Sequence, residues 1–506
     1  MRAKENLFEH WKKLAINIIL TLFGILLVLF WPKIFDHILF KQWELKPGTL
    51  MYKYWHDQPP VKMNCYFFNW TNPEEFLNHS STPKFEEVGP YTFLEYPRKA
   101  NVTFHDHNST VTYKKESKFI FDPEFSVGKM TDIITSPNLI SLAASKQAQS
   151  FNILKVKGVE LGLAFFEQKF HVTKTASELL FEGYEDSMIA VAAEIVKFMD
   201  IEVPFDDRYG WFYKRNESSR ITGQFNADTS FSSFSELRHW TALSKPKFLE
   251  SNCGSYKGAS SDGLFPPLMA KNAQMISVFA HEMCRRIDLD FVEETEVNGI
   301  NGRKFVSGDR MIDNGTNYPE NECYCTGRCV PSGVLNITAC RCGAPIFISY
   351  PHFYKGDQYY LDQVEGMKPD QEKHEMFMTL EPKTSMPLEV AGRFQINILV
   401  EPIPRIKMYR NVPTKFLPIV WFEQSFKIDN KMTFVIKLIL WTPLIGQIIG
   451  FIIAVVSIYM IYKSLQAEKK EQNCPGKENL KSRVPELYPL VDSKLPQDKH
   501  ADNNNH

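Results

Sequence analysis

The stretch LAINIILTLFGILLVLFWP, Leu14 to Pro32, and the stretch LILWTPLIGQIIGFIIAVVSIYMIY, Leu438 to Tyr462, decide the architecture of this chain of 506 residues. Neither stretch contains a charged residue. At about 1.5 Å per helical residue they extend roughly 28 Å and 37 Å, enough to cross a hydrocarbon core of about 30 Å. The sequence therefore predicts two transmembrane helices, one near each end.

Sequons for asparagine glycosylation occur only between these two runs. Such a distribution is hard to obtain by chance, and it indicates that the intervening segment lies outside the cytosol. Lysines and arginines lean weakly toward the same orientation. The acceptor positions are Asn69, Asn78, Asn101, Asn108, Asn216, Asn314 and Asn336.

Five segments follow from this topology. They are a cytoplasmic N-terminal tail (1–13), a first transmembrane helix (14–35), an extracellular or lumenal ectodomain (36–437), a second transmembrane helix (438–462) and a cytoplasmic C-terminal tail (463–506). The first run could instead be a cleaved signal peptide, since basic residues precede it. It exceeds the ~7 to 15 apolar residues of such peptides and ends at Trp31-Pro32 without a small-residue cleavage site, so an uncleaved anchor is favoured.

The composition is that of a protein with a large folded ectodomain and a net charge close to zero. About 400 residues suffice for one large or two fused cores, and 44% of the whole chain is hydrophobic. A formal net charge of −1 argues against nucleic-acid binding. Nine cysteines, five of them between Cys323 and Cys342, predict disulfides because oxidising compartments favour them over zinc sites. Eight ectodomain cysteines allow 105 pairings, so spacing alone leaves the connectivity open.

The ectodomain pattern predicts an α+β fold. Residues 36–135 resemble strands, including a hairpin around Thr103–Thr112. From Asn138 to Met199 the apolar spacing becomes helical with few β-like interruptions, and alternation returns at 394–400. We expect a sheet built from both ends of the ectodomain with helices inserted midway. The polar tail after Lys463 is expected to be disordered.

Sequence signatures of catalysis are missing. His281-Glu282 begins like a zinc-protease helix but lacks the second histidine, and we interpret His281 as an ordinary helix residue. There is no Gly-X-Ser-X-Gly elbow and no phosphate-binding glycine loop. The chain is therefore predicted to be a non-enzyme without cofactor or metal.

Several segments together resemble the class B scavenger receptors, the family that includes croquemort and the lysosomal integral membrane proteins. They occur in the family's order between the two apolar runs, and the resemblance covers essentially the whole ectodomain. The segments are FEEVGPY (85–91), GYED (183–186), DGLFPP (262–267) after Asn252-Cys253, and ISYPHF (348–353).

This resemblance implies an antiparallel β-barrel-like ectodomain with a helical apex at about 137–200 and an internal apolar tunnel for lipid. It also implies three disulfides, Cys253–Cys323, Cys284–Cys340 and Cys325–Cys329. Cys65 and Cys342 stand outside that set, and a further bond between them is left open. The many phenylalanines could line such a tunnel or fill an ordinary core.

Cations of the implied apex are candidate contacts for anionic lipid head groups or lipoproteins, with solvated surface lysines as the alternative. The run Leu161–Phe166 departs from the lysine cluster of some members, and an exposed apolar apex would suit a lipid or protein partner. The candidate cations are Lys146, Lys155, Lys157, Lys169 and Lys174.

Two features of the C-terminal tail concern trafficking. Tyr488, Leu490 and Val491 resemble an endocytic signal that would bind an adaptor and cycle the protein between the plasma membrane and endosomes or lysosomes. Cys474 is a candidate for palmitoylation, although it is not tightly juxtamembrane.

The predicted function is that of a receptor that binds lipids or lipid-bearing particles at its apex and mediates lipid transfer to the membrane or endocytosis. A sorting receptor for a soluble lysosomal hydrolase is the first alternative. A two-pass ligand-gated channel is the second, but the spans offer few polar groups for a pore: Asn17, Thr21, Thr442, Gln447 and Ser457. The identity of the lipid and the oligomeric state are not encoded in any motif.

Overall fold

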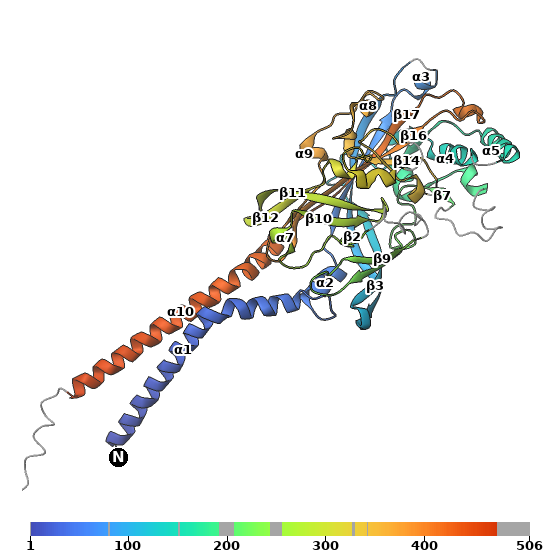
Figure 1. The fold of residues 1–506 in the computed structure, drawn as a ribbon. Coiled ribbons are helices and arrows are strands. Elements are labelled where there is room, and N and C mark those ends of the chain that lie inside the picture. Colours follow the sequence, from blue (N-terminus) through green and yellow to red (C-terminus); the bar gives the residue numbers. More distant parts are fainter. Residues whose placement is uncertain are drawn as a thin grey trace, which may run out of the picture. The chain divides into compact units, whose positions relative to one another are not determined.

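A computed structural model of the chain describes residues 2–78, 81–149, 152–191, 207–242, 256–325, 329–341 and 343–472. The chain divides into two units (Figure 1). One contains residues 1–35 and 441–506, and the other contains residues 36–440.

The first unit is formed by the two long terminal helices, α1 (Arg2–Gln42) and α10 (Asn430–Gln472). Their segments Phe8–Gln42 and Asn430–Lys469 are long and apolar enough to cross a membrane. Only 6% and 17% of the most apolar windows are buried, as expected of helices whose side chains face lipid rather than a protein core. Both helices extend beyond the predicted spans 14–35 and 438–462.

The second unit is built on one large antiparallel sheet. Its strands follow the order β10-β11-β12-β15-β16-β17-β1-β2-β3-β8-β9, and β13 and β14 are attached beside β16. Strand β1 therefore lies between its neighbour β2 and the C-terminal β17, with Lys62 opposite Ser425. The prediction that both ends of the ectodomain build the sheet is confirmed.

The strands of this sheet have the following bounds: β1 Val61–Trp70, β2 Phe85–His105, β3 Thr110–Phe121, β8 Gln224–Asp228, β9 Leu237–Thr241, β10 Met275–Ala280, β11 Arg285–Val297, β12 Ile300–Val306, β13 Leu335–Asn336, β14 Ile346–Ser349, β15 Phe377–Leu380, β16 Pro387–Val400 and β17 Lys415–Lys427. Two small sheets pair β4 (Ile133–Pro137) with β5 (His171–Thr175) and β6 (Tyr184–Glu185) with β7 (Arg208–Tyr209).

The sheet is nearly closed by a short irregular segment, residues 259–261. The carbonyl of Ala259 accepts a hydrogen bond from the backbone N–H of Leu237 in β9. The backbone of Ser260 donates to Ser277 and accepts from Phe279, both in β10. The segment thus bridges the two edge strands. Closure leaves fewer unpaired backbone groups at the edges.

The conformation of Gly89 explains one residue of the FEEVGPY motif. Gly89 has φ +127°, and a Cβ at this position would lie 2.7 Å from the carbonyl oxygen of Cys65. Strand β1 changes register against β2 at that point, between Cys65 and Phe67. A side chain would prevent the close approach of the two backbones.

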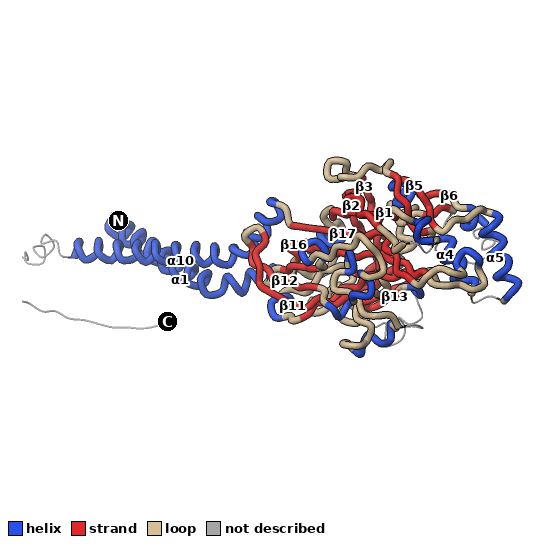
Figure 2. The backbone as a smooth tube through the Cα atoms, turned by 90° about the horizontal axis from the view of Figure 1, so that it is seen from above, coloured by secondary structure: helices blue, strands red, loops and turns tan. Residues whose placement is uncertain are grey.

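Helices α4 (Leu139–Ala148) and α5 (Ile153–Phe165) lie together at one end of the strands, while the β11–β12 hairpin lies at the other end (Figure 2). At the hairpin end, Val297 and Ile300 pack with Ile436 in the first turns of α10. The α4–α5 end is therefore far from the point at which this unit continues into the C-terminal span. We call it the apical end.

Helices α4 and α5 lie in the region 138–199, where helical spacing was predicted, and β5, a π-helical turn (Glu178–Glu182) and β6 interrupt the helical pattern after α5. Residues 187–191 are helical again, and 192–206 lie outside the described residues. His281 is in the turn between β10 and β11 rather than in a helix. The hairpin around Thr103–Thr112 is confirmed by β2 and β3.

Further short α-helices in the described part of the chain lie around the sheet: α2 Leu50–His56, α3 Pro73–Leu77, α7 Met269–Asn272, α8 Gln358–Leu361 and α9 Gln371–His374.

Candidate functional site

The apical helix α4 begins at a hydrogen-bonded cap. The Asn138 side chain accepts from the backbone N–H of Ser141 at 3.1 Å, as a residue at this position commonly does. Its amide group donates to the Gln168 side chain and to the carbonyl of Lys169, both at 2.9 Å. One side chain therefore starts α4 and fixes the segment that follows α5.

The apical loop, residues 401–412 between β16 and β17, is held against both helices. Ser141 of α4 shares a hydrogen bond of 2.7 Å with the Tyr409 hydroxyl. The backbone N–H of Lys407 donates to Glu160 of α5 at 3.3 Å. Strand ends remote in sequence thus help to support the helical end of the molecule.

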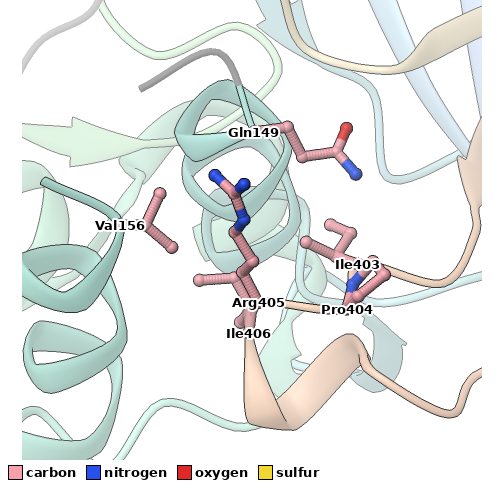
Figure 3. A pocket seen from close by; sticks show the side chains of 6 residues that line it. All are labelled: Gln149, Val156, Ile403, Pro404, Arg405 and Ile406. Atoms are coloured by element: carbon pink, nitrogen blue, oxygen red, sulfur yellow. The ribbon is translucent and has the colours of Figure 1, made fainter. Parts of the chain in front are cut away.

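A small pocket opens between the helices and this loop (Figure 3). Figure 3 shows Arg405 in the middle of the lining side chains, with Val156 of α5 on one side and Ile403 and Pro404 on the other. The volume is 190 Å³, below the about 300–1,000 Å³ of typical ligand pockets. It can accept a head group or one protein side chain, but not a whole lipid.

Arg405 is the apical cation that the sequence did not reveal. Its side chain is exposed, and within the described residues it makes no hydrogen bond or ion pair. The available signal was a basic, proline-containing connection between two strands. Because Arg405 is far in sequence from residues 137–200, its position at the apical end could not be predicted.

The outer face of α5 is apolar. Val156 and Leu163 point into the protein and are 3% and 4% exposed. Four large apolar side chains face outward on the other side and are 65 to 81% exposed: Ile153, Leu154, Leu161 and Phe165. An exposed patch of this kind is typical of a surface that binds lipid or protein.

The lysines predicted as apical contacts have different surroundings. Lys146 forms an ion pair with Glu401, and Lys174 lies 3.8 Å from Glu178. Lys157 on α5 and Lys169 after it are exposed. Lys155 belongs to α5, but its side chain lies outside the described residues.

Inside the sheet lies a cluster of phenylalanines. Residues directly opposite in paired strands share a face, which places Phe93 with Phe121 and Phe394 with Phe422. Phe181 and Phe212 insert between them, and neighbouring ring centroids are 4.7 to 5.6 Å apart. The phenylalanine cluster consists of Phe93, Phe119, Phe121, Phe181, Phe212, Phe394 and Phe422.

Most of this cluster is only half-buried. Phe119, Phe121, Phe181, Phe212 and Phe394 retain intermediate exposure. By contrast, two phenylalanines of β1, Phe67 and Phe68, are 0% exposed. These five phenylalanines therefore keep accessible apolar surface in the fold.

The same inner face carries a buried ionic cluster centred on Asp262 of the DGLFPP motif. Its carboxylate lies 2.8 Å from Lys99 and 3.2 Å from Lys115. It also accepts hydrogen bonds from Tyr113 and from the Trp55 indole. Burial alone would raise the pKa of Asp262, but the charges of Lys115 and Lys99 outweigh it and hold that pKa well below its ordinary value.

Glu95 is a second polar group on the inner face. Ser117 donates to it at 2.6 Å and Gln424 at 2.8 Å. Burial nevertheless raises the pKa of Glu95, since these two hydrogen bonds only partly compensate the lost hydration. The interior is therefore apolar with a few fixed polar groups, as ligand-binding interiors are.

Two further motifs meet on the outer face of the sheet. Glu87 of FEEVGPY lies 2.6 Å from the Nε2 atom of His352 in ISYPHF and accepts from the Trp421 indole at 2.7 Å. His374 stacks on His352 with ring centroids 4.6 Å apart. Burial, followed by the charge of His352, lowers the pKa of His374 to about 4.

A second cavity of 490 Å³ lies at the end opposite the apical loop, beside the first turn of α10. Its lining combines apolar side chains such as Phe426 and Met432 with charged residues. Arg393 and Glu423 of that lining are paired at 2.7 Å. Its size lies within the about 300–1,000 Å³ of ligand pockets.

The cysteines form long-range and local links. Cys284 is bonded to Cys340 and Cys325 to Cys329, which are two of the implied pairs. Cys323 is disulfide-bonded, while Cys253 lies outside the described residues. Cys65 is a free, buried thiol, and Cys342 also lies outside the described part.

Other predicted sites fall into two groups. Tyr488, Leu490, Val491 and Cys474 lie beyond the described part of the chain, which ends at 472. Among the sequon asparagines, Asn78, Asn101, Asn108 and Asn216 are exposed, and Asn69, Asn314 and Asn336 are half-buried. In the described ranges no group of three or more His, Cys, Asp or Glu side chains is arranged to hold a metal ion.

Comparison with known proteins gives one consistent result. The sequence profile of the CD36 family matches residues 15–466. The protein named peste of Drosophila melanogaster is 36% identical over 438 residues, covering 85% of this chain and 78% of peste. Human lysosome membrane protein 2 is 31% identical (88% and 91% covered), and bovine scavenger receptor class B member 1 is 28% identical (91% and 89% covered).

Proposed function

The chain belongs to the CD36 family, and on that premise we propose that this class B scavenger receptor captures lipid-bearing particles at its apical end and passes lipid through the inside of the sheet toward the membrane. No chemical step is part of this proposal. The apolar face of α5 and the exposed cation Arg405 are the proposed contacts for the particle. The charge of Arg405 would select anionic head groups.

The observation that carries the proposal is the half-buried phenylalanine cluster. An acyl chain leaving water gains about 25 cal/mol for each Å² of apolar surface buried, and no specific polar chemistry is needed. Phenylalanines that face inward with surface to spare offer that burial.

The topology in this proposal places residues 36–437 outside the cytosol, with both termini in it. Glycans on the seven sequon asparagines and a further disulfide between Cys253 and Cys323 belong to the same proposal. We propose residence in the plasma membrane with cycling to endosomes or lysosomes. That cycling would use the Tyr488 motif and an endocytic adaptor.

Gly392 offers a way to obstruct the interior without disturbing the strand. It lies opposite Gln424 on the inner face of β16, and a Cβ there would meet only the Gln424 carbonyl oxygen, at 3.8 Å. We expect Gly392→Trp to reduce transfer of a labelled lipid severalfold in cells expressing the full chain. Binding of the labelled particle at 4 °C (about 277 K) should be retained, because the apical end is untouched.

Gly392→Ala is the matched control and should leave both transfer and binding unchanged. Normal lipid transfer by Gly392→Trp, at equal surface expression, would contradict passage through the interior. Loss of particle binding together with transfer would instead show that the substitution disturbs the whole ectodomain.

A second candidate function is sorting of a soluble lysosomal hydrolase, because the exposed apolar face of α5 would also suit a protein partner. Such a receptor would retain a hydrolase inside cells, whereas a lipid carrier would not. Secretion of one hydrolase after Leu161→Asp, with lipid transfer unchanged, would favour sorting. Loss of lipid transfer with normal hydrolase retention would favour lipid uptake.

A further inference from the structure

Helix α1 contains a proline, Pro32, within its C-terminal third. Proline has no backbone N–H, so it cannot donate the helical hydrogen bond to the carbonyl four residues earlier. That carbonyl belongs to Val28. In a hydrocarbon core no water is present to replace the missing donor, and an unsatisfied backbone group is costly.

Gln447 of α10 supplies a donor at this position. Its side-chain nitrogen lies 3.1 Å from the carbonyl oxygen of Val28. Gln447 is one of the few polar residues of the second span, and a polar side chain inside a membrane requires a partner. The other span provides that partner at the one carbonyl that Pro32 leaves without its helical donor.

The approach of the two helices is made possible by small residues. A Cβ on Gly24 would lie 2.6 Å from the carbonyl oxygen of Gly450 and 2.8 Å from the backbone nitrogen of Ala454. A Cβ on Gly450 would lie 2.8 Å from the carbonyl oxygen of Gly24. The helix backbones therefore touch one turn away from Gln447, as helices with small interface residues do in membranes.

A second hydrogen bond crosses in the opposite direction. The Trp31 indole, adjacent to Pro32, donates to the carbonyl of Thr442 at 3.0 Å. Gly446 permits this contact, because a Cβ there would lie 2.0 Å from the indole ring. Each helix thus donates one side-chain hydrogen bond to the backbone of the other.

We propose that Gln447 is a positioning residue that locks the two spans into one hairpin by supplying the donor that Pro32 withholds from Val28. The anchor is then a single unit whose two helices are paired within one chain. This role is independent of the lipid-transfer proposal, and it accounts for Gln447 without a pore.

The test measures whether the two helices stay together in the full chain. His10 and Glu468 lie at the ends of the two helices, with Nε2 and Oε2 3.9 Å apart. Spin labels on His10→Cys and Glu468→Cys, in a Cys474→Ser background, report their separation by pulsed electron paramagnetic resonance in lipid nanodiscs. We expect a short, narrow distance distribution.

Gln447→Leu should broaden this distribution and shift it to longer distances. Pro32→Ala restores an N–H to α1, so Gln447→Leu should have little effect in that background. Thr21→Val is the matched control, because Thr21 bonds to Asn17 of its own helix at 2.8 Å. It should leave the distribution unchanged.

An unchanged distribution in Gln447→Leu overturns the proposal. The proposal is also overturned if Gln447→Leu broadens the distance distribution equally in the Pro32 chain and in the Pro32→Ala chain. The side-chain donor of Gln447 would then not be compensating for the N–H that Pro32 lacks. If Gln447→Leu lowers the yield of folded chain, recovery in Pro32→Ala/Gln447→Leu supports the proposal and failure to recover overturns it.

Discussion

At the scale of single residues, Asp262 is the most connected group inside the sheet. We expect Asp262→Asn to lower the free energy of unfolding by about 3–5 kcal/mol, because Lys99 would be left as a buried charge without a carboxylate. Chemical unfolding of the purified chain, followed by tryptophan fluorescence, measures this change.

Asp207→Asn is the control for Asp262. Asp207 also contacts a lysine, Lys214, at 2.7 Å, but both side chains are more than half exposed. Exposed pairs contribute about 0–1 kcal/mol, so the control should change stability little. If the two variants lose similar amounts of unfolding free energy, the buried ion pairs of Asp262 stabilise the fold no more than an exposed pair does.

We expect His374 to make the stability of the ectodomain sensitive to acid. Its pKa of about 4 in the folded chain lies below the ordinary value of about 6.5, so the folded state favours the neutral ring. The contribution of His374 to the free energy of unfolding is therefore full above about pH 6.5. It falls by about 2–3 kcal/mol as the pH decreases to 4. The ring faces His352, Glu87, Asp370 and Arg393, and its Nδ1 accepts from the Asp370 backbone at 2.9 Å.

His374→Gln should flatten the stability difference between pH 7 and pH 4.5, measured by thermal unfolding. The amide oxygen can still accept the backbone hydrogen bond but does not titrate. The exposed His239 provides the control variant His239→Gln. If both variants show the pH profile of the unmodified chain, other groups cause its acid sensitivity.

Residue roles were the hardest level to predict from the sequence. Lys146 and Lys174 were proposed as ligand contacts on their position alone, but each has a carboxylate neighbour in the fold. The position of Arg405 could not be predicted, because it depends on contacts of the β16–β17 connection with α4 and α5. Spacing along the chain carries no information about such contacts.

At the scale of elements, patterns within short stretches of sequence predicted several helices and strands. Features that depend on contacts between distant segments were harder to predict. The β2–β3 hairpin followed from alternation around a turn, and both terminal helices followed from uninterrupted apolarity. The bridge at Ala259–Ser261 could not be predicted, because an irregular segment between two edge strands has no periodicity. The interruption by β5 was missed for the same reason, since five residues are too few to show a period.

Helix α5 gives the prediction that belongs to this scale. Leu161→Asp places a charge in the exposed apolar face without affecting the buried Val156 and Leu163. We expect particle binding at the cell surface to fall severalfold, because the apolar contact must then desolvate a carboxylate. Val127→Asp, which introduces the same charge at an apolar side chain that is 79% exposed and lies outside α5, is the control. Unimpaired binding by Leu161→Asp would remove α5 from the contact surface.

At the scale of the whole molecule, the proposed topology can be tested directly. Peptide N-glycosidase should lower the apparent mass of the chain expressed in animal cells, because exposed asparagines such as Asn101 and Asn108 are accessible. Epitopes on both tails should bind antibody only after the cells are permeabilised. Labelling of either tail on intact cells, or an unchanged mass, would contradict this topology.

The position of β1 between β2 and β17 has a consequence for biosynthesis. Lys62 finds its partner Ser425 only roughly 360 residues later, which at typical synthesis rates of about 5–20 residues per second corresponds to about 20–70 s on the ribosome. Until then one edge of β1 is an open template for other strands. A chain terminated prematurely before β17 would keep that edge permanently, and chaperones that recognise unpaired strands would have a direct mark of an incomplete product.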